Sequence, residues 1–274
     1  MHEASVGFQC PECVAEGRRT VRQATGRFGG GAVAKTEYVT FALIALNVAV
    51  FLLDAVLSKG TSLGGFGLGG GGGGFSPAQL YGAVLGVSAE SGGTMYTGIA
   101  DGAYYRLITA DFVHFGLLHI ALNMWALYVL GRYLERTLGH LRFAALYLVA
   151  GIGGNVAVYL FSAPLQLSAG ASTSIFGLFV AVFFINRKLG RETTSIVVLL
   201  VINVMATFWV KSISIAGHIG GLVTGALLAV GLAYAPRKQR SLIQWGTFVA
   251  VLLILAGLTV WRTQDLLGNP ELYR

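Results

Sequence analysis

The 274-residue sequence has few charged residues, and cysteine and proline are scarce in it. Only 11% of its residues are charged, against about 25% in an ordinary soluble domain, and its mean hydropathy is +0.70. Charges this sparse cannot cover a globular surface in water, which excludes a soluble fold. The 2 cysteines exclude a disulfide-stapled secreted domain, and the 39 glycines, which follow no three-residue period, exclude collagen.

Long apolar runs are what the sequence has instead. A helix that crosses a hydrocarbon layer about 30 Å thick needs about 20 apolar residues. Seven runs approach this length and predict an all-α integral membrane protein, at about 38–57, 114–131, 143–161, 170–186, 193–210, 215–235 and 242–261. The first run follows 37 residues that include five basic ones, so we expect a signal anchor and no cleaved leader.

The basic residues predict which side of the membrane each loop occupies. If the amino terminus is cytoplasmic, all but five of the 19 Lys and Arg fall on that side, the five being Lys59, Arg106, Lys211, Arg262 and Arg274. We therefore expect a multi-pass protein of a bacterial plasma membrane, with its amino terminus in the cytoplasm and its carboxyl terminus outside. Because topology accounts for the net charge of +7, no nucleic-acid partner is expected.

The chain divides into three parts. Residues 1–37 form a cytoplasmic segment, 38–235 a six-helix core, and 236–274 a basic linker, a seventh transmembrane helix and a short outer tail. Residues 58–113 form a long outer loop with a glycine-rich insert, and its unbroken glycine run at 69–74 predicts a flexible loop tip. A phosphate-binding loop is disfavoured because the Gly-Lys-Ser/Thr ending is missing.

Cys10 and Cys13 have the spacing of half a zinc site in the amino-terminal segment. A structural zinc normally takes four ligands, no second pair of cysteines follows, and only His2 is near in sequence. We therefore expect no bound metal and no cofactor.

Three polar side chains within the runs are placed to meet. Counting back from the cytoplasmic arginine that ends each run puts His119, Ser172 and His218 roughly 20 to 28 Å from the inner surface, at 1.5 Å per residue. All three lie in the outer half of the membrane, and helix tilt can absorb the differences. Polar groups are costly in hydrocarbon, so their meeting indicates a functional site below the outer surface.

The neighbours of these residues suggest the chemistry. Ser172 opens a helix, where free backbone N–H groups and the helix dipole can stabilise an oxyanion. His119 and Asn123 are four residues apart and share a helix face, so two more donors can point at one spot. Gly217, Gly221 and Gly225 form a stripe beside His218 that predicts close packing on the helix of Ser172, within reach of its hydroxyl.

The acidic residues narrow the mechanism further. None of the 12 lies in the second, fourth or sixth run, so we expect His218 to be held by packing and a neutral hydrogen bond, giving a Ser-His dyad without a carboxylate. Asp54 is expected to be solvated at the outer end of the first run. His140 is expected at the surface, and Asn155 and Asn203 in hydrogen bonds between helices.

With these residues identified, residues 38–235 resemble the rhomboid intramembrane serine proteases, with one helix added at the carboxyl end. The motifs that carry the resemblance are Tyr105-Arg106, His114-x4-His119-x3-Asn123, Gly170-Ala171-Ser172 and Gly217-His218 followed by the glycines of its helix. The resemblance implies a six-helix bundle and proteolysis of membrane proteins within or next to their transmembrane segments, without a cofactor. Oligomeric state is left open.

The resemblance also implies roles for individual residues. Ser172 would be the nucleophile, His218 the base, and His119 and Asn123 would help to form the oxyanion hole. The supporting residues are Arg106, which would brace the outer loop, a structural His114, Phe176 against the base histidine, and the glycines Gly170 and Gly221.

Thr173 departs from the family pattern. Rhomboids usually carry Gly-x-Ser-Gly, whereas here a β-branched residue, which adopts positive φ with difficulty, replaces the last glycine. This keeps a second hypothesis open, a catalytically silent rhomboid-like protein that binds or escorts transmembrane clients. A transporter is disfavoured because neither inverted repeats nor midplane charges are found.

Overall fold

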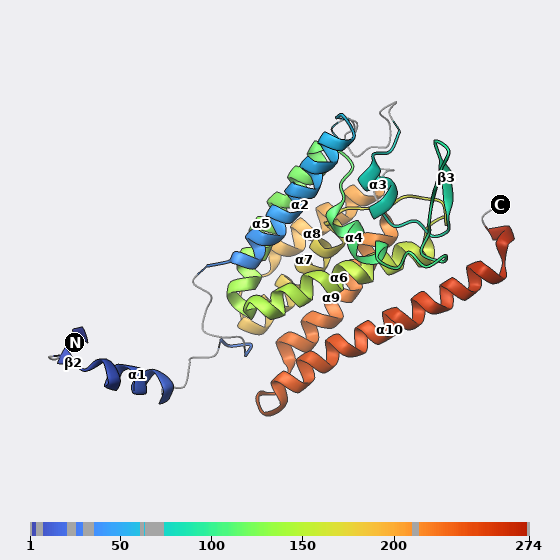
Figure 1. Cartoon of the computed structure of the whole chain (residues 1–274). Coiled ribbons are helices and arrows are strands. Elements are labelled where there is room, and N and C mark those ends of the chain that lie inside the picture. The colour runs from blue at the N-terminus through green and yellow to red at the C-terminus, as the bar shows by residue number, and fades with distance from the viewer. Residues whose placement is uncertain are drawn as a thin grey trace.

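The computed structural model of the chain describes residues 2–3, 8–20, 26–29, 36–60, 63, 74–209 and 214–272. Its main body is a bundle of apolar helices (Figure 1). In chain order these are α2 (Tyr38–Leu57), α5 (Leu117–Leu138), α6 (His140–Phe161), α7 (Ser172–Leu189), α8 (Thr194–Trp209), α9 (Ile215–Tyr234) and α10 (Arg240–Gly268). Six of these helices, all except α8, are long and apolar enough to cross a membrane. The prediction of an all-α, multi-pass integral membrane protein is confirmed.

Most predicted runs coincide closely with these helices, and the second and seventh differ most: α10 ends at Gly268, seven residues beyond the predicted 261. The fifth run, predicted at 193–210, coincides with α8, whose 16 described residues extend about 24 Å, and residues 210–213 after it lie outside the described part of the chain. The second run was placed at 114–131, whereas α5 begins three residues later and ends seven residues later. The glycine run predicted at 69–74 lies outside the described residues except for Gly74.

Shorter elements connect and flank the bundle. They are β1 (His2–Glu3), β2 (Phe8–Gln9), α1 (Pro11–Thr20), α3 (Pro77–Gly82), β3 (Ala89–Ser91), β4 (Thr94–Tyr96), α4 (Arg106–Thr109), η2 (Ala110–Phe112), η3 (Arg237–Gln239) and η4 (Pro270–Leu272). β1 pairs antiparallel with β2, and β3 pairs antiparallel with β4. Gly92 and Gly93 join β3 to β4, and their positive φ angles suit a tight hairpin turn.

The helices α6, α7 and α9 form the centre of the bundle. In Figure 1, α2 and α5 run side by side along one edge and α10 lies along the opposite edge, with the central helices between them. Glycines allow the close approach: a Cβ on Gly225 of α9 would lie 2.3 Å from the Cα of Gly177 on α7. A Cβ on Gly153 of α6 would lie 2.0 Å from Thr224 Oγ1 on α9. The predicted glycine stripe therefore does pack on the helix of Ser172.

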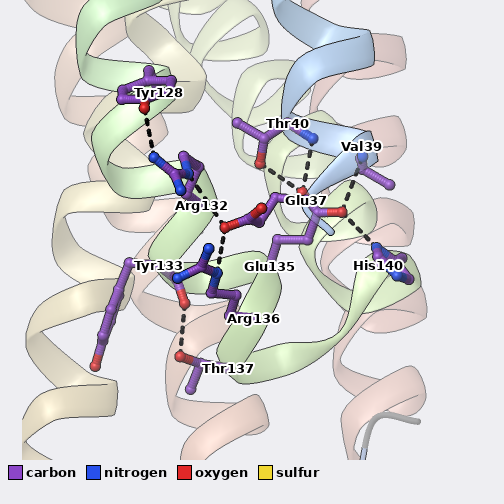
Figure 2. A network of polar contacts seen from close by, with 10 residues as sticks. All are labelled: Glu37, Val39, Thr40, Tyr128, Arg132, Tyr133, Glu135, Arg136, Thr137 and His140. Atoms are coloured by element: carbon purple, nitrogen blue, oxygen red, sulfur yellow. Dashed lines mark hydrogen bonds and ion pairs between the residues drawn. The ribbon is translucent and has the colours of Figure 1, made fainter. Parts of the chain in front are cut away.

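Glu135 explains why α5 continues beyond its predicted end (Figure 2). The side chain is fully buried and accepts hydrogen bonds from the backbone N–H groups of Val39 (2.9 Å) and Thr40 (2.8 Å), so it caps the first turn of α2. His140 contacts the same carboxylate and stacks on Tyr38 with ring centroids 3.8 Å apart. The expectation that His140 is an ordinary surface residue was wrong, because its imidazole contacts the buried carboxylate of Glu135.

Glu37 extends this network at the same end of the bundle. Its buried carboxylate contacts the guanidinium groups of Arg132 and Arg136 on α5 (Figure 2). The last turns of α5 are charged, and they stay helical because their arginines pair with Glu37, the residue just before α2.

Asp54 ties the outer loop to α2. It is buried and accepts hydrogen bonds from Ser76 Oγ (2.6 Å) and the backbone N–H of Ala78 (3.1 Å). The expectation that Asp54 is solvated was wrong, because the loop folds back over the end of the helix.

Of the two asparagines expected to hydrogen-bond between helices, Asn155 does so and Asn203, among the described residues, does not. Asn203 donates to the carbonyl of Leu199 within its own helix. Asn155 of α6 donates to the carbonyl of Leu107 (3.0 Å) and to Asp111 (3.2 Å), both in the outer loop.

Candidate active site

Ser172 begins α7 immediately after a turn that requires glycine. Gly170 has φ +136°, and a Cβ built there would lie 2.7 Å from His119 Cε1 and 2.8 Å from His119 Nε2. Both the conformation and the close approach exclude a larger residue. The same point lies 3.6 Å from Ser172 Oγ, so His119 and Ser172 face one small space beside Gly170.

The structure brings Ser172 and His218 together. His218 Nε2, from α9, lies 2.8 Å from Ser172 Oγ, and the imidazole is 7% exposed. Gly221 permits this approach, because a Cβ there would lie 2.0 Å from the carbonyl oxygen of Thr173. The hydroxyl and the imidazole are thus within hydrogen-bond reach, as activation of a serine nucleophile requires.

Thr207 of α8 determines which nitrogen of His218 carries the proton. His218 Nδ1 lies 2.7 Å from Thr207 Oγ1, and the Thr207 hydroxyl donates to the carbonyl of Asn203 at 2.9 Å. When the single hydroxyl proton of Thr207 is donated to the Asn203 carbonyl, Oγ1 accepts from His218 Nδ1–H. The lone pair then lies on Nε2, toward Ser172, which is the tautomer of a general base.

Phe176 covers one face of the imidazole. The rings of Phe176 and His218 are stacked with centroids 4.0 Å apart and an interplanar angle of 19°. Phe176 lies one turn after Ser172 on α7, so the helix that carries the hydroxyl also holds the ring that it faces.

His119 presents a donor beside Ser172. The backbone N–H of Phe115 donates to His119 Nδ1 at 3.3 Å, which places the proton of a neutral ring on Nε2. That nitrogen lies beside Gly170, 2.8 Å from the position of a Cβ there. Asn123, one turn further along α5, is buried, and its Nδ2 has no hydrogen-bond partner among the described residues. Two donors from one helix face therefore remain available for a developing negative charge.

His114 supports the turn before the serine. Its Nε2 accepts a hydrogen bond from the backbone N–H of Ala171 at 3.4 Å, and its ring packs edge-on against His119 with centroids 5.1 Å apart. Burial, with a smaller contribution from His119, lowers the pKa of His114 well below its usual value, so the ring stays neutral and can accept.

Arg106 braces the outer loop, as its position in the motif implies. The side chain is fully buried, and it donates to the carbonyls of Thr97 (2.8 Å), Ala83 (2.7 Å) and Leu80 (2.8 Å). One guanidinium thereby satisfies three backbone groups that the irregular loop leaves unpaired.

Cys10 and Cys13 lie close together at the start of α1, with their sulfur atoms 2.7 Å apart. Within the part of the chain that the structure describes, no group of three or more His, Cys, Asp or Glu side chains could hold a metal ion.

Two contributors to the site were missed in the sequence. Thr207 is an unremarkable threonine in an apolar run, although its spacing of four from Asn203 indicates a bond to its own helix. Asp111 was considered only as an acid outside the runs, yet it lies buried against the first turn of α7. No local pattern signals either contact.

Comparisons with known proteins match this architecture. The family model of the Rhomboid domain matches residues 101–235, which include His114, His119, Ser172 and His218. YdcA of Bacillus subtilis, whose name also places it among the rhomboids, is 35% identical over 137 residues, which are 48% of this chain and 69% of YdcA. The chain belongs to the rhomboid family.

Other rhomboids are similar over comparable stretches. The rhomboid protease GluP of Bacillus subtilis is 42% identical over 163 residues, which are 57% of this chain and 31% of GluP. RHOMBOID-like protein 6 of Arabidopsis thaliana, a mitochondrial protein, is 31% identical over 183 residues, 57% of this chain and 58% of that protein. The chain thus spans about a third of GluP and about two thirds of YdcA.

Proposed function

We propose that this rhomboid is an intramembrane serine endopeptidase that cleaves membrane proteins within or next to a transmembrane segment. The observation that carries the proposal is the 2.8 Å contact between Ser172 Oγ and His218 Nε2, with Thr207 holding the proton on Nδ1. A base in the wrong tautomer could not take the serine proton, so this arrangement supports a working dyad.

The reaction follows from the positions of the donors and acceptors. His218 Nε2 takes the hydroxyl proton as Ser172 Oγ attacks the substrate carbonyl. The tetrahedral oxyanion is held by the Ser172 N–H, His119 Nε2–H and Asn123 Nδ2–H. His218 then gives its proton to the leaving amine, and water hydrolyses the acyl-enzyme with the same base.

The depth of the site constrains the substrate. A peptide bond within a regular helix is shielded by its neighbours, so we expect small or helix-breaking residues near the bond that is cut. Water and substrate reach Ser172 from the outer side, with the amino terminus in the cytoplasm, as the distribution of Lys and Arg favours.

Thr173 gives no support to a silent, client-binding rhomboid. It lies within α7, and Lys59 is the only described non-glycine residue with positive φ, so no backbone strain arises at Thr173. Its methyl group packs toward α9, with Cγ2 3.1 Å from a Cβ built on Gly217, and its hydroxyl donates to Asp111. The extra atoms fill the helix contact behind Ser172.

The test uses the full chain purified in detergent and a fluorogenic single-span substrate. We expect turnover and labelling of Ser172 by a fluorophosphonate, both lost in Ser172→Ala and His218→Ala. Ser241→Ala changes an exposed serine of α10 and serves as the matched control. Equal turnover by Ser172→Ala would refute the assignment of the nucleophile. Client co-purification without turnover or labelling would favour the client-binding alternative.

A further inference from the structure

Asp111 is an acid buried where a charge is costly. It lies in η2 of the outer loop and is 1% exposed, and no ion pair reaches it among the described residues. A buried carboxylate without a cation is strongly disfavoured, so the group needs a physical explanation.

Its surroundings are built to hold a carboxyl group. Oδ1 accepts from Thr173 Oγ1 at 2.7 Å and from Asn155 Nδ2 at 3.2 Å, and Oδ2 lies 3.0 Å from Ser174 Oγ. Gly151 of α6 makes the room, because a Cβ there would lie 1.6 Å from Oδ2. The helices α6 and α7 thus leave one fitted space for this side chain.

Ser174 indicates the protonation state of the acid. Its hydroxyl lies 2.8 Å from the carbonyl oxygen of Tyr147 as well as 3.0 Å from Asp111 Oδ2. A carbonyl can only accept, and the serine has one proton, so a proton on Oδ2 lets the acid donate to Ser174 while Ser174 donates to Tyr147. Burial, partly opposed by the hydrogen bonds, raises the pKa of Asp111 to about 7, so the neutral acid makes up about half of the population at pH 7 and predominates below it.

The acid acts on the segment that carries the nucleophile. Thr173 and Ser174 directly follow Ser172. On the other side, the N–H of Gly170 donates to the carbonyl of Ala110 at 2.8 Å, and Ala110 directly precedes Asp111. The short turn η2 therefore holds the chain both before and after Ser172.

We propose that Asp111, as a neutral carboxylic acid, is a positioning residue that fixes the Ser172 turn through Thr173 and Ser174. Asp111 touches neither the nucleophile nor the base. It determines where the hydroxyl and the Ser172 N–H point. The proposal rests on the proposed proteolytic function, and it pairs the loop acid with the threonine that replaces the usual glycine of the family pattern.

The decisive variants separate geometry from charge. Asp111→Asn is isosteric: its oxygen can accept from Thr173 and Asn155, and its NH2 group can donate to Ser174. We expect kcat within about twofold of wild type for Asp111→Asn, and a fall of about tenfold or more for Asp111→Ala at unchanged KM. All rates are expressed per site titrated with a fluorophosphonate, so that loss of folded protein does not count as loss of activity.

Thr173→Val tests the same hydrogen bond from the other side. We expect it to lower kcat, and we expect Asp111→Ala combined with Thr173→Val to be no slower than Asp111→Ala alone, because both remove one bond. Thr263→Val is the control: it removes the buried hydrogen bond between Thr263 of α10 and Tyr159 (2.9 Å), which includes no member of the Asp111 network, so it should lower the melting temperature and leave kcat per titrated site within about twofold.

The outcomes that overturn the proposal are specific. An unchanged kcat per site in Asp111→Ala and Thr173→Val would show that the network stabilises the fold and does not position Ser172. An Asp111→Asn variant as slow as Asp111→Ala would show that the negative charge is needed. Should Asp111→Ala fail to fold, Thr173→Val and Asp111→Asn still decide the question.

A spectroscopic readout separates this proposal from the proteolytic one. Infrared difference spectra of wild type and Asp111→Asn should show the carbonyl stretch of a protonated carboxyl group, whether or not the protein turns over a substrate. Absence of that band at neutral pH would overturn the neutral acid. A band without any turnover or labelling of wild type would place the failure in the proposed protease function and would remove the positioning role with it.

Discussion

His218 Nδ1 lies 2.7 Å from Thr207 Oγ1, and the proton of that hydroxyl is already committed to the carbonyl of Asn203. In the proposed mechanism, a neutral threonine thus does the orienting that a carboxylate does in a Ser-His-Asp triad. The imidazole gains a fixed tautomer without a buried negative charge in the membrane, where such a charge is costly.

Replacing Thr207 by valine should slow the reaction while the fold persists. Valine keeps the shape but cannot accept from Nδ1, so we expect kcat to fall by about tenfold, the loss that corresponds to roughly one hydrogen bond. Thr207→Ser should restore most of the rate. Thr259→Val in α10 removes a hydroxyl bonded only within its own helix and should leave kcat unchanged. A Thr207→Val enzyme with wild-type kcat would contradict the orienting role.

Gly221→Ala should destabilise the protein. The added Cβ would meet the backbone carbonyl of Thr173 at 2.0 Å, and backbone cannot move aside cheaply, so we expect a loss of about 1–3 kcal/mol or more. Thermal unfolding in detergent measures it. Gly257→Ala in α10 is the matched control, because nothing lies within 4 Å of its Cβ position, and alanine should be neutral or slightly stabilising there. Equal melting temperatures for the two variants would refute close α7–α9 packing.

Glu135→Ala should weaken the junction of α2, α5 and α6. The variant leaves the N–H groups of Val39 and Thr40 without their acceptor, so we expect a loss of about 2 kcal/mol or more. Chemical denaturation followed by tryptophan fluorescence checks this loss. Glu90→Ala, an exposed acid of β3, should change stability little. If the two substitutions cost the same, the capping role of Glu135 is wrong.

The stability of the protein should depend on the protonation of Asp111. Its pKa is raised from 3.8 to about 7 by burial, so the folded protein keeps a proton that the unfolded chain releases above about pH 4. The stabilisation is therefore complete below about pH 4 and is lost as the pH rises through about 7. We expect the melting temperature of wild type to fall across this window relative to Asp111→Asn, which cannot titrate. Parallel pH profiles for the two proteins would contradict the raised pKa.

The bundle was predictable because each membrane-crossing helix requires an apolar run of about its own length, and such runs are visible in the sequence. The first run coincides with α2 at both ends, since its apolar residues end where polar ones begin. The end of α5 was missed because its last two turns carry charges, and only the partners on the entry to α2 make those charges compatible with a buried helix end. Asp54 was misjudged for a similar reason, since hydropathy places the end of a span in water and does not see a loop that returns over it.

The candidate site was partly predictable. Ser172, His218 and His119 were singled out by depth, by glycines and by the family motifs, and the structure places them around one point. Thr207 and Asp111 could not be found this way, because α8 and η2 come beside α7 and α9 only in the folded chain. A threonine in an apolar run and an aspartate in a loop are both common, and only the contacts of Thr207 with His218 and of Asp111 with Thr173 link them to the site.

Hydrogen bonds with η2 hold the chain on both sides of Ser172, so the position of Ser172 depends on the position of the outer loop. A compound or antibody that bends this loop would therefore be expected to shift the Ser172 hydroxyl without touching Ser172 or His218. Such an effect would depend on the contact between Asp111 and Thr173, which a glycine at position 173 could not make.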